Sequence, residues 1–125
     1  MHFGLTEEKE MIVSTVRNFV ETELYPLENE VERTGVVPRE VGMEIKRKSL
    51  ELGFFACNMP EEVGRAGLDK LTFTLVEREL GRASMGLAAY FGRPSGILMG
   101  CNDEQRERYL IPAVKGDRFD ALAMT

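Results

Sequence analysis

The stretch LTEEKEMIVSTVRNFVETELYPLENEVERTG, from Leu5 to Gly35, decides the fold class of this 125-residue chain. Its apolar residues recur at steps of three and four, which predicts an amphipathic α-helix of about seven turns. Thr6 is the predicted N-cap. Pro26 predicts a kink near Leu24, because proline lacks an amide donor and clashes with the preceding turn. The apolar positions are Ile12, Val16, Val20, Leu24, Leu27 and Val31.

The middle of the chain predicts two more helices joined by an ordered loop. Pro38 suits the first turn of one helix, and Gly53 suits its C-cap. The following segment FFACNMPEEVGRAGLDK loses helical periodicity and gathers glycine and proline, so we expect a loop there. From Lys70 the apolar residues lie on more than one side, which predicts a helix packed on two faces.

The last third of the chain predicts buried helices and a short apolar end. The weakly charged stretch that begins at Ser84 predicts the most buried helix, with a kink or break near Pro94. Asn102 and Gln105 resemble a capping box at the start of the last helix. Residues 119–125 suit a first strand whose partners the chain lacks. We therefore expect an all-α fold, a helical bundle of five or six helices in one domain.

Composition and charge exclude several classes of protein. Hydrophobic residues make up 43% of the chain and charged residues 30%, which indicates a globular protein and excludes disorder. The formal net charge is −5, and no basic run exceeds residues 46–48, so nucleic acid is not an expected partner. The apolar stretch from Ala83 to Asn102 contains Arg93 near its middle. Insertion of an arginine at the centre of a membrane helix costs about 2.5 to 3.5 kcal/mol, so we expect no membrane span there.

The residues alone supply no catalytic or metal-binding constellation. His2 is the only histidine, and the chain has no P-loop, GxGxxG or HExxH motif. Cys57 and Cys101 lack CxxC spacing, so we interpret both as buried apolar residues in a reducing compartment. Glu77 and Glu79 point to different sides of a helix and suit solvated faces or structural ion pairs. Considered without family resemblance, the chain is a soluble all-α domain.

Four motifs, spread over nearly the whole chain, carry a family resemblance. The opening LTEEKEMIVSTVRNFV is followed by Pro26, PEEVGRAGLD has Arg65 where a second glycine is common, and ERELGRAS comes next. CNDEQRERYLIPAVKGD is similar to the pattern G-x-x-E-Q-K-x-x-Y-L-P-x-x-x-x-G, with one residue inserted between Leu110 and Pro112. In this order the motifs resemble the N-terminal helical domain of acyl-CoA dehydrogenases.

The resemblance implies a larger flavoenzyme. In this family a helical N-terminal domain, a β-sheet middle domain and a helical C-terminal domain hold FAD and an acyl-CoA substrate where they meet. A glutamate base removes the α-proton and the flavin takes the β-hydride, which yields trans-2-enoyl-CoA. Electron-transfer flavoprotein is the implied electron acceptor, and the whole protein is an implied homotetramer. Residues 1–118 would then be the N-terminal domain, and residues 119–125 would begin the middle domain. We expect this chain alone to be inactive and not to retain FAD.

The resemblance also assigns candidate site residues. The segment LAMT matches the start of the family motif x-x-x-T-E-P-x-x-G-S-D, which places Leu122, Met124 and Thr125 against the isoalloxazine of FAD. An ordinary buried strand is the alternative. The family's acyl-chain wall falls after Ala83, where small residues leave space for an alkyl chain, although such residues also permit close helix packing. The acyl-wall residues are Ser84, Met85, Leu87, Ala88, Phe91 and Gly92.

Two alternative functions stay open at this point. One is a related flavin reaction on the same fold, such as that of an oxidase or a hydroxylase. The other is a free-standing helical interaction module that binds no flavin. A start at Met1 without a visible leader favours a bacterial cytoplasm.

Overall fold

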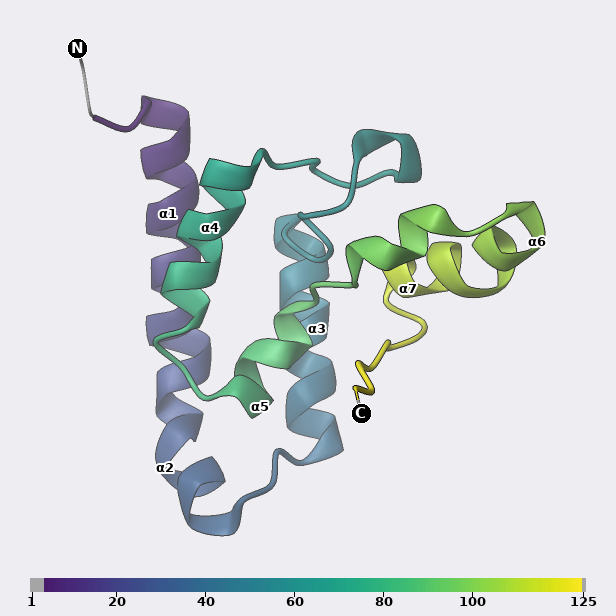
Figure 1. Ribbon diagram of the computed structural model, residues 1–125. Helices are drawn as coiled ribbons and strands as arrows, with labels where there is room; N and C mark the ends of the chain where they lie inside the picture. The colour runs from purple at the N-terminus through teal and green to yellow at the C-terminus, as the bar shows by residue number, and fades with distance from the viewer. Residues whose placement is uncertain (1–3, 125) are drawn as a thin grey trace. The chain divides into compact units, whose positions relative to one another are not determined.

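The computed structural model describes residues 4–124, and every regular element within that range is helical (Figure 1). This confirms the predicted all-α class. The described range holds five continuous helical segments of at least seven residues. Its α-helices are α1 (Glu7–Phe19), α2 (Tyr25–Thr34), α3 (Arg39–Leu52), α4 (Lys70–Leu80), α5 (Met85–Ala88), α6 (Asp103–Gln105) and α7 (Ile111–Lys115). The π-turns are η1 (Val20–Leu24) and η5 (Arg106–Leu110), and the 3₁₀ turns are η2 (Glu61–Val63), η3 (Ala89–Phe91) and η4 (Gly96–Gly100).

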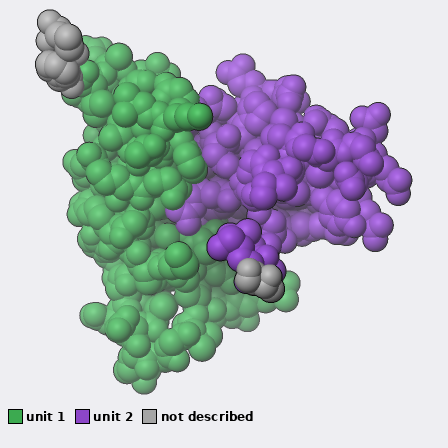
Figure 2. All heavy atoms as spheres, in the orientation of Figure 1, with its two compact units in different colours: residues 1–45, 69–90 green, residues 46–68, 91–125 purple. Residues whose placement is uncertain are grey.

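The chain divides into two compact units, which Figure 2 distinguishes by colour. Unit 1 comprises Met1–Ile45 and Asp69–Tyr90, and unit 2 comprises Lys46–Leu68 and Phe91–Thr125. The backbone of α3 passes from the first unit into the second. Because each unit takes two separate stretches of sequence, neither can form its core from local contacts alone.

Helices α1 and α2 are separated by the π-turn η1, at the place where Pro26 predicted a kink. The Tyr25 amide donates to the Val20 carbonyl, five residues back, so the helix widens directly before the proline. The predicted cap is also confirmed, because Thr6 Oγ1 accepts from the Lys9 amide at 3.3 Å. Gly35 ends α2 with φ 70°, a left-handed conformation that suits glycine.

A second π-turn, η5, lies between α6 and α7. The Ile111 amide donates to the Arg106 carbonyl, and Pro112 follows immediately. This π-turn ends at Leu110, directly before the residue that the family pattern lacks. A helix absorbs one extra residue by widening a single turn, so the insertion leaves the helical path continuous. The predicted capping box between Asn102 and Gln105 is confirmed in full.

In unit 1, α1 and α4 lie side by side and run in the same direction (Figure 1). Near their N-terminal ends, Lys9 donates to Asp69 at 2.8 Å. Further along, Arg17 bonds Glu79. The side chains buried along these two helices are Val13, Val16, Phe19, Thr72, Val76, Glu79 and Leu80.

The prediction that α4 is packed on two faces is wrong for part of the helix. Leu71 is 55% exposed, and Phe73 and Leu75 are only half-buried. The buried side of α4 is instead completed by Thr72 and Glu79, two residues that a hydrophobicity pattern does not count. The helix therefore has one covered face and one partly exposed apolar edge.

Glu79 is a buried carboxylate, 2% exposed, on the α1 side of α4. Arg17 donates to both of its oxygens, at 2.9 and 3.3 Å. Arg82 and Arg78 donate at 3.1 and 3.2 Å. The hydrogen bond from Arg17 is the largest cause that lowers the pKa of Glu79 to about 2, against the opposing effect of burial. Of the two interpretations offered for Glu79, a solvated face and a structural ion pair, the ion pair is correct.

Unit 2 is built around a core of Phe55, Ala56, Met59, Leu110 and Val114. Arg65 closes one side of this core: its Nε donates to the Val114 carbonyl at 2.7 Å, and its guanidinium lies 5.9 Å from the centre of the Phe55 ring. The residues with positive φ that flank Arg65 are Gly64 and Gly67. Position 65 therefore has no conformational need for the second glycine of the family pattern.

The stretch after Ser84 is not the most buried helix, so that prediction is wrong. It forms α5, η3 and η4, with an interruption around Pro94 that agrees with the predicted break. Gly92 has φ 89° and cannot continue a right-handed helix. Met85 is 85% exposed and Ile97 is 78% exposed, because single short turns cannot bury every side of an apolar segment.

Replacement of Glu79 by glutamine tests the ion pair between α1 and α4. We expect Glu79→Gln to lower the free energy of unfolding by roughly 1 to 3 kcal/mol at neutral pH, since three arginines lose their anionic partner. The folded pKa lies below the ordinary value of 4.5, so this stabilisation is complete above about pH 4.5 and is lost as the pH falls towards 2. Urea unfolding at several pH values measures the difference.

The matched control is Glu30→Gln, which removes an exposed carboxylate paired with Arg33 three residues away. It should change the free energy of unfolding by less than about 0.5 kcal/mol. Equal effects of the two substitutions, or a Glu79→Gln effect that persists unchanged at pH 2, would contradict this account.

Candidate functional site

Ser84 begins the segment assigned to the acyl-chain wall and serves as the N-cap of α5. Its Oγ accepts from the Leu87 amide at 3.4 Å, and its own amide donates to Glu28 at 2.6 Å. Both groups thus support the local fold. Met85 is exposed, whereas Leu87 and Ala88 are buried in unit 1. Of these four residues, only Ser84 and Met85 have surface that a ligand can reach.

Phe91 and Gly92 belong to unit 2 and are held by its core. The Phe91 carbonyl accepts from Ser49 Oγ at 2.6 Å, and its ring lies 6.0 Å from that of Phe54. The Gly92 carbonyl accepts from the Ala56 amide at 2.9 Å. A Cβ atom at position 92 would lie 2.1 Å from the Phe55 ring. The space beside this glycine is therefore filled by a phenylalanine.

Residues 119–124 form neither helix nor strand, and their first two residues are anchored. Lys46 Nζ lies 5.4 Å from the centre of the Phe119 ring, and Asp120 accepts from the Ser95 amide at 2.9 Å. Leu122 is 76% exposed and Met124 is 82% exposed. Thr125, the third predicted flavin contact, lies outside the described residues. An anchored start thus leads into an exposed apolar end.

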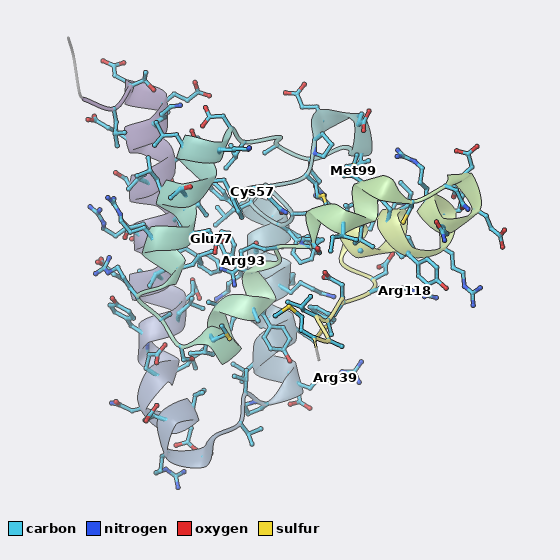
Figure 3. The ribbon with its side chains drawn as sticks, in the orientation of Figure 1. Arg39, Cys57, Glu77, Arg93, Met99 and Arg118 are labelled. Carbon is cyan, nitrogen blue, oxygen red and sulfur yellow. The ribbon has the colours of Figure 1, made fainter. Side chains whose placement is uncertain are left out.

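A pocket that the sequence gave no reason to expect lies beside this anchored start, within unit 2. Its volume is about 300 Å³. The Tyr109 ring contributes one wall and has two guanidinium neighbours, Arg108 at 5.4 Å and Arg118 at 6.0 Å from its centre (Arg118 is labelled in Figure 3). The pocket is lined by Leu98, Tyr109, Ala113, Arg118, Phe119 and Asp120.

Within residues 4–124, no group of three or more His, Cys, Asp or Glu side chains is placed to hold a metal ion. Cys57 is buried as expected, and Cys101 is half-buried (Cys57 is labelled in Figure 3). Two carboxyl groups have clearly shifted pKa values. The pKa of Asp69 and that of Glu79 are each lowered, mainly by hydrogen bonds from cationic side chains. A lowered carboxyl pKa disfavours a general-acid role near neutral pH.

In the part of the chain that the structure describes, no helix has both the length and the apolar character needed to cross a bilayer.

The described residues form a helical domain that ends in exposed apolar side chains at Leu122 and Met124. Residues 6–117 match the acyl-CoA dehydrogenase N-terminal domain family, and the chain belongs to this family. This confirms the resemblance carried by the four sequence motifs.

Named relatives agree with this assignment. The chain is 35% identical to a 3-(aryl)acrylate reductase of Clostridium sporogenes over 96% of its length, and 35% identical to a benzylmalonyl-CoA dehydrogenase of Aromatoleum aromaticum over its full length. It covers 32% and 33% of those proteins, so it spans about a third of their length. An acyl-CoA dehydrogenase structure from Geobacillus kaustophilus shares the fold, with a TM-score of 0.69, 24% identity, and coverage of 94% of this chain and 31% of the other.

Replacement of Gly92 by alanine tests whether this glycine serves the core. We expect Gly92→Ala to destabilise the protein by roughly 1 to 3 kcal/mol, because the new methyl group overlaps the Phe55 ring and φ is positive. Thermal unfolding measures the change. Gly96→Ala is the matched control, since no atom lies within 4 Å of its added Cβ. Unchanged stability of Gly92→Ala would show that the glycine is not needed for packing.

Proposed function

We propose that this chain is the N-terminal domain of a flavin-dependent acyl-CoA oxidoreductase and forms one wall of its acyl and FAD pocket. The observation that carries the proposal is the exposure of Leu122 and Met124, two apolar side chains directly after the family match. Apolar side chains that protrude from an anchored segment indicate a surface that another body covers. Residues 1–118 are then the helical domain, and residues 119–125 lead into the β-sheet domain.

The six acyl-wall residues divide into two roles under this proposal. Ser84 and Met85 have accessible surface and are the candidates for direct contact with the acyl chain. The other four residues support the wall from the interior of unit 1 or unit 2. They are Leu87, Ala88, Phe91 and Gly92, of which the first three are at most 3% exposed.

The proposed flavin contacts suit one edge of an isoalloxazine ring. Leu122 and Met124 offer apolar surface, and residues 121–124 have backbone groups outside any helix or strand. Thr125 would add a hydroxyl beside them. FAD supplies the hydride acceptor in this family, while the residues of this chain only orient it and shield it from water.

The reaction is proposed at the level of the whole protein. A dehydrogenase would convert an acyl-CoA thioester to trans-2-enoyl-CoA, and the names of the two relatives include both a dehydrogenase and a reductase. The family resemblance supports electron-transfer flavoprotein as the redox partner and a homotetramer as the assembly. The bacterial sources of these relatives support a bacterial origin, with the cytoplasm as the proposed location.

The purified chain should carry no flavin absorbance and should not reduce a dye in the presence of acyl-CoA. The reason is that it spans only about a third of the length of its relatives, so most of the proposed flavin and substrate pocket belongs to the rest of the protein. Absorbance spectra and dye-reduction assays measure both properties. Turnover by the isolated chain would contradict the proposal.

The exposed apolar end should bind a hydrophobic dye. We expect the fluorescence of a bound dye to fall at least about twofold in the double variant Leu122→Ser, Met124→Ser, because it removes the protruding apolar surface. Met11→Ser is the control, since Met11 is 68% exposed and lies elsewhere, on α1. Absence of dye binding by the unmodified chain would favour the alternative, a free-standing helical interaction module.

A further inference from the structure

Three arginines of unit 1 gather around one buried carboxylate. Arg17 comes from α1, Arg78 from α4, and Arg82 from the turn directly after α4. All three donate to Glu79, and Arg82 also donates to Glu21 at 3.2 Å. These three arginines form the arginine cluster. The cluster sets three positive charges against two negative ones, in a chain whose formal net charge is −5.

The arginine cluster keeps most of its hydrogen-bonding capacity. Three guanidiniums carry fifteen N–H donors, and the hydrogen bonds to Glu79 and Glu21 use five of them. The guanidiniums are also accessible, since Arg17, Arg78 and Arg82 are 47%, 58% and 39% exposed. The 2% exposed Glu79 lies behind them. The cationic donors are therefore exposed to solvent, while the carboxylate that orients them is buried.

A surface hollow of about 440 Å³ coincides with this cluster. Its lining residues are Arg17, Arg78, Glu79 and Arg82. Ion pairs to Glu79 restrain the guanidiniums before any ligand arrives, so a ligand meets a partly organised set of donors. The hollow is open to solvent, which suits a small hydrophilic group more than an apolar one.

We propose that the arginine cluster binds a phosphate group, either as inorganic phosphate or as a phosphate ester of a small molecule. The planar fork of a guanidinium matches two oxygens of a phosphate, and three forks from α1, α4 and the turn after α4 can reach a tetrahedral group from several directions. A phosphate group also offers more acceptor oxygens to these donors than a carboxylate does. None of the residues of this site is among the proposed acyl-wall or flavin-contact residues.

The test is a titration of the purified chain with sodium phosphate, with glycerol phosphate and with sodium acetate, each against sodium chloride of equal ionic strength. Side-chain NMR signals of arginine Nε groups report where binding occurs. We expect saturable shifts at Arg17, Arg78 and Arg82 with phosphate, with glycerol phosphate or with both. A response to the ester alone identifies a phosphorylated small molecule as the ligand type.

Arg78→Gln is the test variant, because Arg78 is the most exposed member and makes a single hydrogen bond to Glu79. It should weaken phosphate binding about fivefold, the loss expected for one charge-assisted hydrogen bond at an exposed site. Arg33→Gln, which removes an exposed arginine paired with Glu30, should leave phosphate binding unchanged. The proposal is overturned by the absence of saturable shifts at the cluster, by equal binding of acetate, or by equal effects of the two variants.

Discussion

The burial of the Glu79 carboxylate constrains how α1 and α4 pack together in unit 1. A charged group that is 2% exposed is costly unless its oxygens are bonded, and Arg17 on α1 supplies two of those bonds. The pair therefore holds α1 and α4 in one register along their shared direction. Apolar packing by Val16 and Val76 tolerates small slips, whereas this bidentate contact does not. The cost of desolvating the carboxylate thus contributes to a specific arrangement of the two helices.

A π-turn precedes each of two prolines within the helical segments. Pro26 and Pro112 each come directly after a residue whose amide donates to a carbonyl five residues back. The wider turn moves the preceding carbonyl groups away from the proline ring, so the helix continues without a loop. In residues 103–115, Leu110, Ala113 and Val114 are buried on either side of Pro112, whereas α2, which follows the first π-turn, has no buried residue.

Small residues in the acyl-wall segment can indicate either space for a ligand or close packing of the protein, and the sequence does not distinguish the two. Gly92 suggested space for an alkyl chain, yet the Phe55 ring occupies that space. Gly42 behaves alike in unit 1, where an added Cβ would lie 2.2 Å from the Tyr90 ring. A glycine frees volume, but only the surrounding fold decides whether a ligand or an aromatic side chain takes it. Exposure, rather than small size, therefore distinguishes Met85, Leu122 and Met124 as candidates for contact.

The sequence by itself determined the features that depend on neighbours within a turn or two. Helical periodicity, the caps at Thr6 and Asn102, and the interruption before Pro26 are local consequences of side-chain size and hydrogen-bonding groups. Only the tertiary structure decided that Glu79 is buried, that Arg65 bonds Val114, and that Leu71 and Met85 are exposed. These outcomes depend on residues tens of positions apart, and a linear pattern does not say which distant surfaces will exclude water together.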